Sequence, residues 1–98
     1  MDKIEYEARK EIYDEVIREA GPDHQLMKCI EEMSELTKEI CKSFIPGGTS
    51  IDKIADECAD VLITLEQLRI IFDMNEAVCD HMDAKVEQLY KRLLENRL

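Results

Sequence analysis

The sequence has no tryptophan, no long apolar run and few residues that break helices. No stretch approaches the roughly 18 consecutive apolar residues of a membrane-spanning helix. The first residues, 1–5, contain no apolar segment of the kind found in a signal peptide. Strand-like alternation, internal repeats and low-complexity tracts are absent as well. We therefore expect a cytoplasmic protein that does not enter a membrane.

Positive charge is also scarce, because 13 Lys and Arg residues face 23 Asp and Glu residues, giving a formal net charge of −10. This charge repels phosphodiester backbones, so we expect no nucleic-acid partner. A substrate as anionic as a polyphosphate would need metal ions to bridge it to the protein. The 98 residues make one domain, 1–98. A monomer of this size buries only about 60–65% of its unfolded surface, so oligomerisation would help its stability.

The residue patterns of several common metal centres are missing. The four cysteines (Cys29, Cys41, Cys58 and Cys79) show no C-x-x-C spacing and lie in helical patterns. We therefore expect reduced thiols that are buried or partly buried. Neither His24 nor His81 follows a carboxylate by three residues, as the E-x-x-H motif of di-iron bundles requires. Zinc ligands at motif spacing are absent too, which leaves carboxylate oxygens as the candidate ligands.

The three glycines and two prolines gather at two places, Gly21-Pro22 and Pro46-Gly47-Gly48, where they interrupt helices. Asp73-Met74-Asn75 makes a third break. Periodic apolar residues between these breaks predict four helices, over 2–20, 24–43, 51–72 and 76–96. The expected caps are Asp23, Thr49 or Ser50, and Asn75. The fold class is therefore all-α, with four helices in a bundle-like subunit.

The third predicted helix differs from the others because Val61-Leu62-Ile63-Thr64-Leu65 is apolar nearly all round. Ile70-Ile71-Phe72 continues this trend. A helix with such a pattern is buried on several sides, at the centre of a bundle or at a subunit interface. We expect a homodimer or homotetramer with this helix near the interface.

Two acidic clusters, Glu31-Glu32-Met33-Ser34-Glu35 and Glu57-Cys58-Ala59-Asp60, lie in the second and third predicted helices. Residues three apart share one side of a helix, so each cluster forms a vertical pair of carboxylates, Glu32 with Glu35 and Glu57 with Asp60. Crossing the two helices would create an all-oxygen cage suited to Mg²⁺ or Mn²⁺. Acidic runs on helices are commonly solvated faces, which is the alternative interpretation of each cluster. The second cluster adjoins the apolar run, where unpartnered carboxylates are costly.

The pattern E-E-x-x-E followed by E-x-x-D resembles the signature of the all-α nucleoside triphosphate pyrophosphohydrolases. This superfamily includes MazG-like proteins, dimeric dUTPases and phosphoribosyl-ATP pyrophosphohydrolases. Here 21 residues separate the two motifs, and the second continues as Ala59-Asp60-Val61-Leu62. The sequence looks most like short, single-domain MazG-like proteins over residues 23–95. The resemblance implies a MazG-type all-α domain.

The resemblance also implies a reaction, the hydrolysis of a nucleoside triphosphate or dNTP between the α- and β-phosphates. The implied products are nucleoside monophosphate and pyrophosphate, and the implied role is nucleotide-pool cleaning. The implied ligands of Mg²⁺, with Mn²⁺ as a substitute, are Glu32, Glu35, Glu57 and Asp60. The alternatives are phosphoribosyl-ATP as the substrate, or a non-catalytic helical interaction module whose acids provide a charged surface.

Four residues are further candidates for the catalytic and substrate-binding roles. Glu31 could orient or deprotonate the water, or could be solvated, and Glu35 is the second catalytic candidate. Gln25 could contact a nucleobase or only begin the second helix. Lys42 lies two turns beyond Glu35 and could reach a phosphate, or could be a solvated lysine. The sequence leaves these alternatives open.

Overall fold

The computed structural model describes residues 5–98 and is all-helical, with no strand among these residues. Its four helices are α1 (Tyr6–Ala20), α2 (Pro22–Lys42), α3 (Ile51–Ile71) and α4 (Asn75–Leu94). The predicted all-α class and the number of helices are confirmed, while positions 2–4 of the first predicted helix lie outside the described residues. Within residues 5–98, no helix combines the length and apolar character needed to cross a membrane.

The helix boundaries follow the glycine and proline positions more closely than the predicted caps. Gly21 has φ +96° and donates its N–H to the carbonyl of Ile17 at 2.9 Å, which ends α1. Gly21 also occupies the N-cap position of α2, so the predicted cap at Asp23 is wrong. Pro22 begins α2, because its fixed φ and missing N–H suit the first turn of a helix. A single residue therefore turns the chain from α1 into α2.

The connection between α2 and α3 is closed by two short side-chain interactions. The Ser50 hydroxyl accepts the N–H of Lys53 at 3.2 Å, which confirms Ser50 as the cap of α3. Thr49 donates its hydroxyl to the Glu39 carboxylate at 2.6 Å. That hydrogen bond is the main reason why the pKa of Glu39 is lowered. At the last boundary Asn75 is the first residue of α4, not its cap, and Met74 precedes it.

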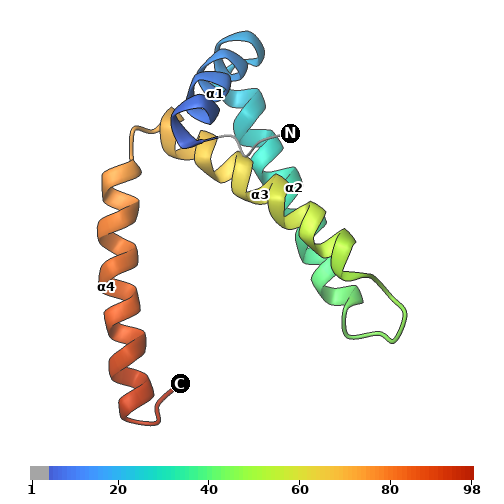
Figure 1. Ribbon diagram of the computed structural model, residues 1–98, viewed down its shortest axis with the longest axis vertical. Helices are drawn as coiled ribbons and strands as arrows, with labels where there is room; N and C mark the ends of the chain where they lie inside the picture. The colour runs from blue at the N-terminus through green and yellow to red at the C-terminus, as the bar shows by residue number, and fades with distance from the viewer. Residues whose placement is uncertain (1–4) are drawn as a thin grey trace.

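Helices α2 and α3 run antiparallel, side by side, and form the main body of the molecule (Figure 1). Helix α1 packs across the end of this hairpin, near the start of α2 and the end of α3. Helix α4 leaves the end of α3 and extends away from the other three helices as a separate arm. Within one chain the four helices therefore do not close into a single bundle.

The interior of the body is small and partly polar. Six residues from the first three helices are buried: Tyr13, Gln25, Cys29, Val61, Thr64 and Gln67. The side-chain amide of Gln25 donates to the Gln67 carbonyl oxygen at 2.6 Å, which joins α2 to α3. This pair satisfies two polar groups that would otherwise be costly to bury.

The single chain differs from two predictions about burial, while burial of the third helix at a subunit interface stays a prediction. All four cysteines are free, but only Cys29 is buried, and Cys41, Cys58 and Cys79 are exposed. Leu62 and Ile63 of α3 are 57% and 42% exposed, although the sequence predicts a helix buried on several sides. The physical reason is that α4 does not cover α3. The side chains of Leu62 and Ile63 therefore stay partly uncovered by residues 5–98.

Candidate metal centre

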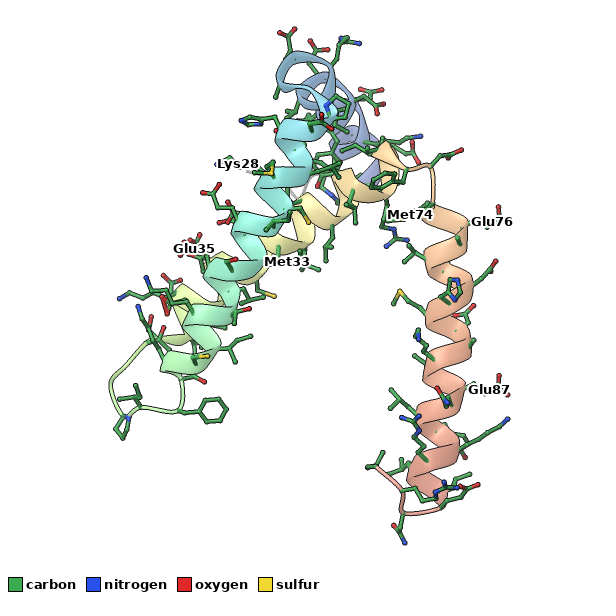
Figure 2. The ribbon with its side chains drawn as sticks, turned by 180° about the vertical axis from the view of Figure 1, so that it is seen from behind. Lys28, Met33, Glu35, Met74, Glu76 and Glu87 are labelled. Carbon is green, nitrogen blue, oxygen red and sulfur yellow. The ribbon has the colours of Figure 1, made fainter. Side chains whose placement is uncertain are left out.

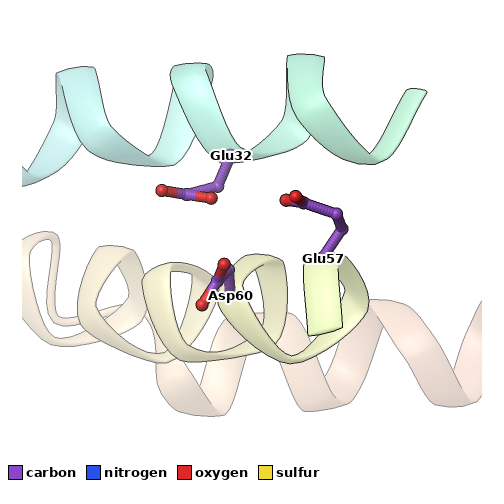
Figure 3. Close-up of side chains that lie close together, drawn as sticks. All are labelled: Glu32, Glu57 and Asp60. Atoms are coloured by element: carbon purple, nitrogen blue, oxygen red, sulfur yellow. The ribbon is translucent and has the colours of Figure 1, made fainter. Parts of the chain in front are cut away.

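Three acidic side chains from two neighbouring helices point toward one another. Glu32 extends from α2 toward α3, and Glu57 and Asp60 extend from consecutive turns of α3 toward α2 (Figure 3). One carboxylate oxygen from each of the three lies within 4.8 Å of the others. We call Glu32, Glu57 and Asp60 the carboxylate triad. Each member is half-buried, so the triad lies at the edge of the interface between the two helices.

Within the described residues, no cationic side chain forms an ion pair with the triad. Among residues 5–98, the ion pairs of lysine and arginine side chains within 4.0 Å go to other carboxylates, and none reaches the triad. Burial raises the pKa of Glu32, and the charges of Asp60 and Glu31 raise it further. Burial likewise raises the pKa of Glu57, together with the charges of Asp60 and Glu32. A cation placed between the three carboxylates would relieve this repulsion.

The donor set of the triad fits a hard divalent cation. All three ligands are carboxylate oxygens, which Mg²⁺ and Mn²⁺ prefer. With bonds of 2.0–2.1 Å, oxygens on one Mg²⁺ lie at most about 4.2 Å apart. Because the oxygens of the triad lie within 4.8 Å of one another, small side-chain rotations are enough to bring them to coordination distance of one ion. Mg²⁺ commonly keeps several waters, which would complete the coordination.

The fourth predicted ligand, Glu35, lies outside the triad. Its side chain is exposed, one turn beyond Glu32 on α2. Its charge nevertheless raises the pKa of both Glu32 and Glu57, so it contributes to the field of the site. The structure thus brings together three of the four predicted ligands and places Glu35 beside them.

The other predicted site residues have different surroundings. Glu31 is exposed and pairs with Lys28 at 3.6 Å, and this lysine also lowers the pKa of Glu32 slightly against the other effects. The sequence spacing of four suggests a pair between Lys28 and Glu32, but the structure pairs the lysine with Glu31. Gln25 is buried, and its amide binds Gln67. Lys42 lies in the last turn of α2, where it pairs with Glu39 at 3.6 Å.

Comparison of the chain with protein-family models, curated proteins and solved structures gives no match. The geometry and charge of the carboxylate triad, together with the two acidic motifs that supply it, are therefore the basis for a functional proposal.

Proposed function

We propose that the protein is a Mg²⁺-dependent nucleotide pyrophosphohydrolase. Its substrate would be a nucleoside triphosphate or dNTP, cleaved between the α- and β-phosphates to monophosphate and pyrophosphate. The observation that supports the proposal best is the convergence of three carboxylates from α2 and α3 with no neutralising cation among residues 5–98. The resemblance of the two acidic motifs to those of MazG-like proteins supplies the reaction.

The net charge of the chain supports a role for metal in substrate binding. At −10 the protein repels a triphosphate, and the triad has two further acidic side chains beside it, Glu31 and Glu35, against one lysine, Lys28. When bound, Mg²⁺ would neutralise the triphosphate, polarise the phosphoryl group and lower the pKa of a coordinated water. The protein would contribute the three carboxylates that hold the ion and fix its position between α2 and α3.

The exposed carboxylates beside the triad are the candidates for handling the water. Glu35 lies one turn from Glu32 and is accessible to solvent, so it could orient the water and accept its proton. Glu31 is also exposed, but its carboxylate pairs with Lys28 at 3.6 Å, and this lysine occupies one side of it. We therefore assign the base to Glu35 and a supporting electrostatic role to Glu31.

The test is product analysis with a panel of NTPs and dNTPs, with Mg²⁺, with Mn²⁺ and with excess EDTA. We expect monophosphate and pyrophosphate in equal amounts, and no turnover in EDTA, because the triad without a cation would repel the substrate. Ion-exchange chromatography separates the products. Orthophosphate as the only product would indicate that another bond is cleaved. No turnover with any member of the panel, nor with phosphoribosyl-ATP, would favour a non-catalytic helical module.

A further inference from the structure

Helix α4 exposes an apolar stripe that the described chain leaves largely uncovered, since α3 reaches only its first members, Cys79 and Met82. The stripe consists of Cys79, Met82, Val86, Leu89 and Leu93, which alternate in spacing between three and four residues. None of the residues of α4 is buried, and the last four members of the stripe are between 53% and 60% exposed. Such alternation is typical of a helix that packs lengthwise against other helices. Helix α4 therefore has the sequence of a buried helix and the surroundings of an exposed one.

A second uncovered apolar surface lies on the hairpin. The large exposed apolar residues of α2 and of the turn after it are Met27, Ile30, Met33, Ile40, Phe44 and Ile45. Figure 2 shows Met33 and Met74 on the side that faces the open angle between the hairpin and α4, while Glu76 and Glu87 point away from it. An apolar hollow of about 360 Å³ lies where α4 leaves α3, and it is lined mainly by Leu62, Leu65, Leu68, Met74, Val78 and Met82. The inner side of this angle is thus apolar on both arms.

The overall dimensions show that the chain exposes more surface than a compact monomer of its size. The radius of gyration over Cα atoms is 16.6 Å, whereas a compact domain of this length has about 12.6 Å. The accessible surface is 7967 Å², whereas a folded monomer of 11.4 kDa exposes about 5,800 Å². The chain therefore exposes about 2,200 Å² more than a compact monomer does.

We propose that a second copy of this chain covers these surfaces, with α4 of each copy lying along the apolar face of the α2–α3 hairpin of the other. The excess area agrees with this occupant, since obligate homodimers bury about 1,000–2,500 Å² per subunit. The exchange is reciprocal, so a single twofold axis buries both stripes and leaves no open surface for further growth. One chain provides both the stripe and the face that would receive it.

The distal half of the arm and the hairpin carry opposite net charges. Residues 85–97, the distal half of the arm, carry four Lys or Arg and two Glu side chains. Residues 22–72, the hairpin with its ends, carry five Lys or Arg and ten Asp or Glu side chains. The basic end of one arm would therefore lie against the acidic hairpin of the other copy, while two hairpins packed directly on each other would repel.

The first test is the mass of the intact chain in solution, by light scattering after size exclusion and by sedimentation equilibrium. We expect a dimer of twice 11.4 kDa at micromolar concentration. Leu89→Lys places a charge in the stripe and should raise the dimer dissociation constant at least about 30-fold. Ala84→Lys adds the same charge at an exposed position on the opposite side of α4 and should leave the dimer intact. A monomeric wild type, or a Leu89→Lys dimer of unchanged affinity, would overturn the proposal.

The second test distinguishes arm exchange from other ways of burying the stripe. In a background without the four native cysteines, one copy carries Leu89→Cys on α4 and the other carries Met33→Cys on α2. A short bismaleimide should link the two different copies when they are mixed. Linkage between two Leu89→Cys copies would indicate that the arms pair with each other and would overturn the exchange. A third variant carries both substitutions on one chain. If the reagent linked the two cysteines only within that chain, the arm would fold back on its own hairpin, and the exchange would be overturned. Neither measurement depends on hydrolysis, so each tests the dimer independently of the proposed activity.

Discussion

Replacing Glu57 with glutamine is expected to lower kcat/KM for triphosphate hydrolysis by at least about 100-fold. The change preserves the shape of the side chain but removes a charged ligand from the triad. One oxygen from each of the three carboxylates lies within 4.8 Å of the others. Loss of a residue that merely supports a metal ligand already costs 10–100-fold in affinity or activity, so loss of the ligand itself should cost more. The measurement is steady-state hydrolysis over a titration of Mg²⁺.

The matched control is Asp56→Asn on the neighbouring residue of α3. It removes the same charge from an exposed side chain outside the triad, so it should change activity less than about threefold. If Glu57→Gln and Asp56→Asn reduced activity equally, general acidity of the surface rather than a defined site would explain the effect.

Glu35→Gln should behave differently from Glu57→Gln, because Glu35 lies beside the triad and is exposed. A base that accepts the proton from water affects the chemical step, so we expect a fall in kcat of about 10²–10⁴-fold. The Mg²⁺ concentration at half-maximal activity should change little. A large rise in that concentration would instead make Glu35 a fourth ligand, as the sequence alone predicts.

The fourfold division of the chain could be predicted because its causes are local. Gly21 takes φ +96° and Pro22 starts α2, and both properties belong to the residue types themselves. The caps at Asp23 and Asn75 were less predictable, since Pro22 can start the helix one residue earlier and Asn75 can join the first turn of α4. The sequence therefore predicts the four helices, whereas the exact first residue of a helix depends on the residues beside the expected cap.

The candidate site was only partly predictable because it depends on how two helices cross. Three residues turn an α-helix by about 300°, so side chains three apart differ in direction by about 60°. On α3 both Glu57 and Asp60 still point toward α2, whereas on α2 only Glu32 joins the triad and Glu35 is exposed. The tilt between the helices decides which member of a pair faces inward, and no residue pattern specifies that tilt.

The position of α4 relative to the other helices could not be predicted from its residue pattern. Its apolar stripe predicts burial, yet no residue of α4 is buried by the described chain. A pattern of apolar residues specifies that a face needs a partner, but it does not specify whether that partner belongs to the same chain. In this protein, exposed apolar side chains lie on α4, at Leu62 and Ile63 of α3, and on the exposed face of α2.

Glu32→Gln is expected to have opposite effects on stability without and with Mg²⁺. In the folded, metal-free protein, burial and the charges of Asp60 and Glu31 raise the pKa of Glu32. A carboxyl with a raised pKa stabilises the fold fully below its unfolded pKa of about 4.3, and this contribution is lost as the pH rises through the folded value. At pH 7 the charged Glu32 therefore opposes folding.

Removing the charge at pH 7 should relieve repulsion from Asp60 and Glu31 worth about 0.4–1.0 kcal/mol in total and raise Tm by about 2–8 °C. At pH 4 the gain should shrink, because Glu32 is then largely protonated in the wild type. Saturation with Mg²⁺ at ten times its Kd should stabilise the wild type by about 1.4 kcal/mol and raise its Tm by about 6–11 °C, but leave Glu32→Gln nearly unchanged. Differential scanning calorimetry at one protein concentration measures all three conditions, with Glu11→Gln on α1 as an exposed control of equal charge change. Without Mg²⁺ the Glu32→Gln variant would be more stable than the wild type, and with Mg²⁺ it would be less stable. If the triad were only a solvated acidic surface, Glu32→Gln and Glu11→Gln would change the stability by similar amounts, with and without Mg²⁺.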